Sequence, residues 1–134
     1  LSKKLEISID TAKYRMKKLI EKKILVGFWP SVNISRLGFQ WHILFIRLRN
    51  APKSKIDELG KYLKNNKFIV KAYTTLGPWD MIIELIVHDT AHFTQILDEI
   101  KEKFCEIIHD HESLLVLQEI YYTHFVKEYY KIVE

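Results

Sequence analysis

The sequence predicts an α+β protein of two parts: a short helical part at the amino terminus, then a longer part in which strands and helices alternate. Three observations predict this fold class. Positive charge is concentrated before Gly38, an apolar pattern with helical period lies in the same stretch, and an alternation of strand-like and helix-like segments follows it. The two parts are therefore expected to differ in architecture and in surface charge.

Composition limits the class of protein. The 134 residues are 48% hydrophobic, which is enough for one good core or two small ones. No apolar stretch reaches the roughly 18 to 20 residues of a membrane span, so we expect no membrane partner. Leu1-Ser2 lacks both an initiator Met and a signal-like apolar stretch, and we interpret it as a shortened amino terminus. The single cysteine, Cys105, fits a reducing cytoplasm, where we expect the protein to act.

Charge divides sharply along the chain. Residues 1–38 hold nine Lys/Arg and three Asp/Glu, a net charge of +6, whereas residues 39–134 hold twelve and fourteen, a net charge of −2. Concentrated positive charge favours a polyanionic partner such as nucleic acid. A solvated basic helix face is the alternative, and charge alone does not separate the two.

The first part reads as two helices joined by a turn. Residues 1–6 resemble the end of a helix, and Ser8 is the expected N-cap of the next, because its hydroxyl can accept a bond from a free backbone N–H. An apolar stripe with helical spacing follows, formed by Ala12, Met16, Leu19 and Ile20. This pattern predicts a helix-turn-helix with a basic second helix, and residues 24–30 then predict a β-rich, turn-punctuated wing.

The second part alternates between strand and helix. Bulky and β-branched residues predict strands, and apolar residues at helical spacing predict amphipathic helices. In chain order we expect a strand at 40–49, a helix at 54–65, and strands at 68–75 and 81–88. A helix that Asp89-Thr90 caps and that runs to about 104 follows, and then a strand at 113–125.

The resulting βαββαβ order predicts a ferredoxin-like unit, an antiparallel sheet with both helices on one face. The other face would need cover, since aromatic residues lie in or beside the strands, and we expect a dimer interface there. These aromatic residues are Trp41, Tyr73, Trp79, Tyr121 and Phe125.

Three phrases carry a resemblance to a known family. They are residues 8–19, Gly27-Phe28 with Leu37-Gly38-Phe39, and Gly77-Pro78-Trp79-Asp80. In this order and spacing the chain resembles the Lrp/AsnC (feast/famine) transcription regulators over essentially its whole length, without the family's first helix. The expected domains are an incomplete (winged) helix-turn-helix at 1–38 and a ferredoxin-like sensing and oligomerisation domain at 39–134.

The resemblance implies a homodimer that assembles into tetramers or octamers, binds double-stranded promoter DNA and senses an amino acid or similar small metabolite. The residues expected to contact DNA are Ser8, Asp10, Thr11, Lys13, Tyr14, Arg15, Lys17 and Lys18. An exposed helix face remains the alternative. For Asp10 there is a second role, in which its carboxylate stabilises the positive, amino-terminal end of the helix dipole. For Arg15 the alternative is an ion pair with Glu6 or Glu21.

The turn of Leu76, Gly77, Pro78, Trp79 and Asp80 resembles the family's effector-binding loop, in which backbone N–H groups and a carboxylate hold a zwitterion at a subunit boundary. A plain tight turn with a core Trp is the alternative. Pro78 lacks the N–H that a ligand carboxylate would use, so a family member without an amino-acid response also remains possible.

Catalysis, metal binding and cofactors are not expected. His88 and His92 are four residues apart but belong to different predicted elements, and His109-Asp110-His111 lies in a predicted loop. Cys105 has acidic neighbours, which disfavour a reactive thiolate. Two alternatives stay open. One is a sensor that has lost DNA binding. The other is an enzyme like the siroheme decarboxylases of similar architecture, which have a histidine-rich phrase in the strand where this chain has His42 alone.

Overall fold

The computed structural model describes residues 6–28, 30 and 32–121. The chain divides into two compact units, residues 1–32 and residues 33–134. In the described residues, no helix is both long enough and apolar enough to cross a lipid bilayer.

The first unit contains one described helix, α2 (Ile9–Glu21). Ser8 is its N-cap, as predicted, and the Ser8 hydroxyl accepts a hydrogen bond from Thr11 N at 3.1 Å. The predicted apolar stripe is only half-buried, and Ile20 is 49% exposed. The amphipathic pattern therefore sets the helix, but nothing in the described part of this unit buries its apolar side.

Two expectations for the first unit differ from the structure. Glu6 lies in a turn with φ of 52° and is not the last residue of a helix, while residues 1–5 lie outside the described residues. In the predicted wing, residues 24–28 and Pro30 form no strand. β-branched residues favour a strand only where a neighbouring strand supplies partners, and the described residues supply none here.

The second unit begins with a short 3₁₀ helix, η1 (Ile34–Leu37), which ends at Gly38. Gly38 has φ of 80°, a left-handed conformation that glycine adopts without steric cost, and this turns the chain into the sheet. The sheet and its helices follow as β1 (Gln40–Leu48), α3 (Lys53–Asn65), β2 (Ile69–Thr74), β3 (Met81–Val87), α4 (Thr90–Lys103) and β4 (Ile108–Val116).

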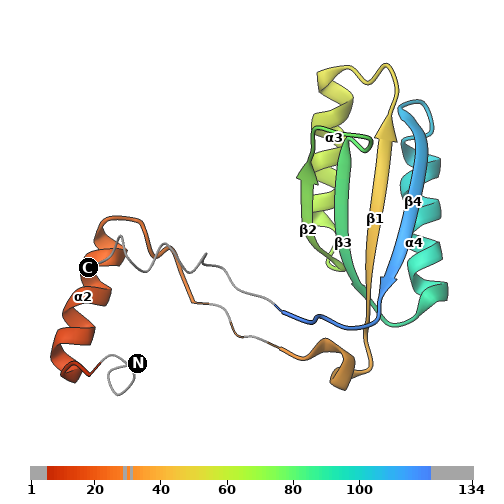
Figure 1. Ribbon diagram of the computed structural model, residues 1–134. Coiled ribbons are helices and arrows are strands. Elements are labelled where there is room, and N and C mark those ends of the chain that lie inside the picture. The colour runs from red at the N-terminus through yellow and green to blue at the C-terminus, as the bar shows by residue number, and fades with distance from the viewer. Residues whose placement is uncertain (1–5, 29, 31, 122–134) are drawn as a thin grey trace. The chain divides into compact units, whose positions relative to one another are not determined.

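The four strands form an antiparallel sheet in the order β2-β3-β1-β4, and α3 and α4 both lie on one face of it (Figure 1). This is the α+β arrangement of a ferredoxin-like domain, so the predicted architecture of the second part is confirmed. Strands β2 and β4 are the sheet edges.

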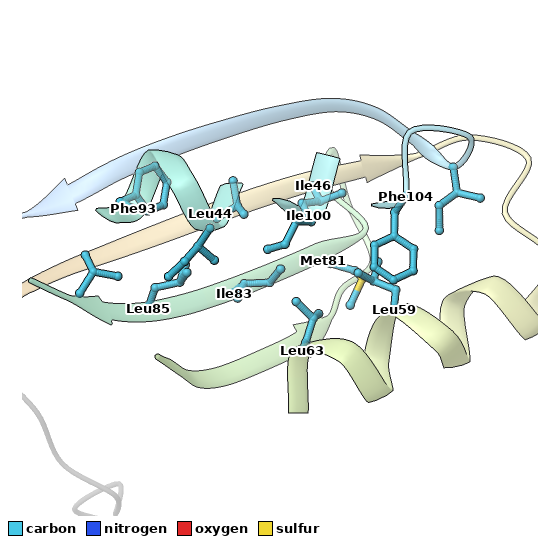
Figure 2. Close-up of a cluster of buried hydrophobic side chains, with 13 residues drawn as sticks. Leu44, Ile46, Leu59, Leu63, Met81, Ile83, Leu85, Phe93, Ile100 and Phe104 are labelled. Atoms are coloured by element: carbon cyan, nitrogen blue, oxygen red, sulfur yellow. The ribbon is translucent and has the colours of Figure 1, made fainter. Parts of the chain in front are cut away.

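The core lies between the sheet and the two helices, where Figure 2 shows apolar side chains from both layers in one cluster. The sheet contributes alternate residues of β1 and β3, and the helices contribute residues at helical spacing. The buried members include Leu44, Ile46, Leu59, Leu63, Ile83, Leu85, Phe93, Ile96, Ile100 and Phe104.

The last strand is misplaced in the prediction. We expected it at 113–125, whereas β4 begins at Ile108, and residues 117–121 are not in a strand. His109-Asp110-His111, expected in a loop, belongs to β4, with Asp110 opposite Arg47 and His111 opposite Ile46. An edge strand tolerates these polar residues because it is only partly covered. The start of β4 is set by its hydrogen bonding to β1, which includes a bulge between Arg47 and Leu48. Phe125 lies outside the described residues.

Candidate effector turn and DNA-contact helix

The predicted DNA-contact residues all lie in or next to the first two turns and a half of α2. Lys13, Tyr14 and Lys17 are exposed, as is Arg15. In the described residues, Arg15 makes no ion pair, so the suggested pairs with Glu6 or Glu21 do not form. The helix therefore presents a solvent-exposed basic surface.

Four residues of this set also make local contacts within the helix. Ser8 and Thr11 join their hydroxyls at 2.8 Å while capping the helix. Lys18 Nζ lies 4.7 Å above the Tyr14 ring. Hydrogen bonding to the Tyr14 side chain raises the pKa of the Lys18 ammonium above its ordinary value.

The predicted effector turn lies at the end of the sheet where β1 also ends (Figure 1). Thr75 N donates to Asp80 O at 2.9 Å, and the Thr75 hydroxyl donates to Trp79 O at 2.5 Å, so these bonds close the turn. Leu76 is fully exposed, and Trp79 is half-buried rather than a core residue. The structure therefore agrees with the alternative of a plain tight turn, but not with a Trp in the core.

Strand β1 holds the turn through three hydrogen bonds. Asp80 N donates to Ile46 O at 2.9 Å, Leu48 N donates to Asp80 Oδ2 at 2.7 Å, and Arg47 Nε donates to Pro78 O at 2.9 Å. The Arg47 guanidinium also lies over the Trp79 ring, 4.9 Å from its centroid. Sequence reasoning missed Arg47, although an Arg at the end of the apolar run 43–46 was a visible irregularity.

The face of the sheet opposite the helices carries apolar side chains that no helix covers. We call it the open sheet face. Its members are the alternate residues Trp41, Ile43, Phe45, Ile82, Ile86 and Leu114. Tyr73 and the Lys71–Glu84 ion pair (3.4 Å) lie on the same face, and Glu84 is only 14% exposed.

Among the described residues, the histidines are not gathered into a metal centre. The described residues contain no group of three His, Cys, Asp or Glu side chains that could hold a metal ion. The His88 and His92 rings stack at 5.2 Å, and His92 Nδ1 accepts a 3.4 Å bond from His88 N. His42, on which the enzyme alternative depended, is buried at 4% exposure and stacks on Phe93 at 4.3 Å.

Comparison with known proteins decides the family. The model of the Lrp/AsnC ligand binding domain matches residues 42–126, more than half of the chain. The chain belongs to the Lrp/AsnC family. Among curated relatives, it is 34% identical to the HTH-type transcriptional regulator Ptr1 of Methanocaldococcus jannaschii over 74% of this chain and 66% of that protein. It is 23% identical to the proline dehydrogenase transcriptional activator of Rhizobium radiobacter, over 74% of this chain and 64% of that protein.

Solved structures of Lrp/AsnC proteins share the fold. The AsnC structure from E. coli matches with a TM-score of 0.74 and 21% identity, over 92% of this chain and 82% of AsnC. A transcriptional regulator from Neisseria meningitidis, solved as a complex with L-Met, matches with a TM-score of 0.80 and 17% identity, over 97% of this chain and 84% of that one.

Proposed function

We propose that this Lrp/AsnC protein is a cytoplasmic, homo-oligomeric regulator that binds promoter DNA and responds to an amino acid or similar small metabolite. The observation that carries the proposal is family membership combined with a capped, exposed basic helix, α2. The matched relatives are named as transcriptional regulators, which supports regulation rather than catalysis. The division into domains 1–38 and 39–134 is part of the proposal.

DNA binding is assigned to α2 as the second helix of a helix-turn-helix. Its exposed residues Lys13, Tyr14 and Lys17 are placed to contact phosphates and base edges, as recognition helices do in the major groove. Ser8 and Thr11 support the same function by fixing the start of the helix. The remaining members of the proposed contact surface are Asp10, Arg15 and Lys18.

The test of DNA binding is a salt titration. We expect Lys13→Ala with Lys17→Ala to weaken operator binding and to lower the slope of log affinity against log salt by about 2, because each phosphate contact contributes about 0.9. The charge-matched control is Lys61→Ala with Lys64→Ala, on α3 of the other unit. An unchanged slope in the α2 variant would remove the assignment.

A homodimer is assigned to the open sheet face. This face is apolar over three strands, and monomers seldom leave such a surface in water. We expect Ile86→Glu to shift the protein toward monomer in analytical ultracentrifugation, because a charge would be buried in the interface. Val70→Glu, in the bulge of edge strand β2, is the control and is expected to leave the oligomer intact.

Effector binding is assigned to the turn Leu76–Asp80. The solved Neisseria regulator of the same fold is a complex with L-Met, which supports an amino acid as the ligand class for this chain. A thermal-shift screen of the twenty amino acids tests the assignment. A shift with one or a few of them is expected, and no shift with any of them would contradict it.

A further inference from the structure

The turn Leu76–Asp80 has no positively charged group of its own for a ligand carboxylate. Pro78 has no N–H, and its carbonyl already accepts from Arg47 Nε. One Asp80 oxygen accepts from Leu48 N, and Asp80 N donates to Ile46 O. A positively charged donor for the ligand carboxylate has to come from outside the turn, because the turn's free donors, the N–H groups of Leu76, Gly77 and Trp79, are uncharged.

Arg47 is placed to supply that donor. Its guanidinium has five N–H groups, of which the contact to Pro78 uses the one on Nε. Within the described part of the chain, no ion pair involves Arg47, and Asp110, its neighbour across the sheet, accepts instead from His111 N at 2.9 Å. Stacking on Trp79 holds the plane of the group at the turn. Its two Nη groups form the fork that binds carboxylates in a bidentate manner.

Asp80 supplies the opposite charge. Its Oδ2 accepts from Leu48 N, whereas Oδ1 has no hydrogen bond to any described residue. A zwitterionic amino acid carries one carboxylate and one ammonium group, and the turn is flanked by one guanidinium and one carboxylate. The two side chains therefore match both charged groups of the ligand.

We propose that Arg47 binds the α-carboxylate of the amino-acid effector and that Asp80 Oδ1 accepts from its ammonium group. This assignment rests on the proposed effector function and adds Arg47 as its carboxylate-binding residue.

The test compares an amino acid with its carboxamide. The tightest-binding L-amino acid of the screen and its C-terminal amide are titrated calorimetrically into wild-type protein, Arg47→Gln and the control Arg49→Gln, which removes the same charge two residues further on. In Arg47→Gln we expect the acid to bind about 10- to 100-fold more weakly, the loss of a charge-assisted bond, with the affinity for the amide nearly unchanged. Arg49→Gln is expected to behave as wild type.

Each other result overturns the assignment in a distinguishable way. Equal weakening of acid and amide in Arg47→Gln would mean that Arg47 only holds the turn. Unchanged binding of the acid would mean that Arg47 is not a ligand contact. No binding of any amino acid by the wild type would remove the effector function and this assignment with it. Arg47→Lys, which keeps the charge but lacks the planar fork, is expected to fall between wild type and Arg47→Gln.

Discussion

Side chains that cap helices were readable from sequence, whereas those that join distant segments were not. Ser8 and Asp89 were predicted as caps because the capping bond reaches only three residues along the chain. Arg47 and Pro78 are 31 residues apart, and their contact depends on the sheet that brings β1 beside the turn. The turn at Leu76–Asp80 could thus be predicted from its sequence, but Arg47, the residue of β1 that anchors it, could not.

His42 makes the stability of the second unit depend on pH. Burial lowers the pKa of His42 below its ordinary value of 6.5, because the charged imidazolium is disfavoured against Phe93. As the pH falls below about 6.5, the unfolded chain takes up this proton before the folded one does. Stability is therefore full above that pH and declines as the pH falls toward the folded pKa.

The measurement is thermal unfolding between pH 7.5 and 5 for wild type and His42→Phe. Phe keeps the stacked ring on Phe93 and cannot titrate. We expect the variant to gain stability relative to wild type as the pH falls, since only the wild type carries the His42 imidazole. A difference between the two proteins that stays constant with pH would contradict this origin.

The elements whose bounds depend on local signals were predicted well. Strands β1 and β3 and helices α3 and α4 lie within two residues of their expected limits, because a cap, a Pro or a Gly marks their ends. The bounds of strand β4 were predicted poorly, because its start is set by pairing with β1 rather than by its own residues. The predicted wing failed for the same reason, since its strand needs a partner.

The N-cap of α4 gives a test at the scale of one element. The Asp89 carboxylate accepts from His92 N at 2.8 Å, so Asp89→Ala removes the capping bond. We expect a loss of about 1 kcal/mol in the free energy of unfolding, measured in denaturant. Asp98→Ala on the same helix removes an exposed carboxylate 4.0 Å from Lys101 and is expected to change stability much less. Equal losses in the two variants would argue against the capping role.

The whole molecule combines one well-packed unit with one whose apolar side stays partly exposed. The core of the second unit is built from both helices and the sheet (Figure 2), whereas α2 has no buried residue. The sequence predicted the former because its apolar periodicity is complete over 40–104.

A substitution at Leu44 tests how much the buried core contributes to the stability of the second unit. Leu44 is fully buried in β1, and Leu44→Ala is expected to cost about 2–5 kcal/mol, since it leaves a cavity between the sheet and α4. Leu76→Ala, the same substitution at a fully exposed site, is expected to change stability by less than about 0.5 kcal/mol. Chemical denaturation of both variants measures the contrast, and similar losses would contradict the described core.

The most direct test of ligand-responsive DNA binding is a fluorescence anisotropy titration of the protein on its own promoter, at two salt concentrations, with and without a mixture of amino acids. We predict tight binding that weakens steeply with salt and changes when the amino acids are present. Absence of binding at low salt would contradict the assignment of α2 to DNA. Binding that the amino acids leave unchanged would contradict the coupling of the effector turn to regulation.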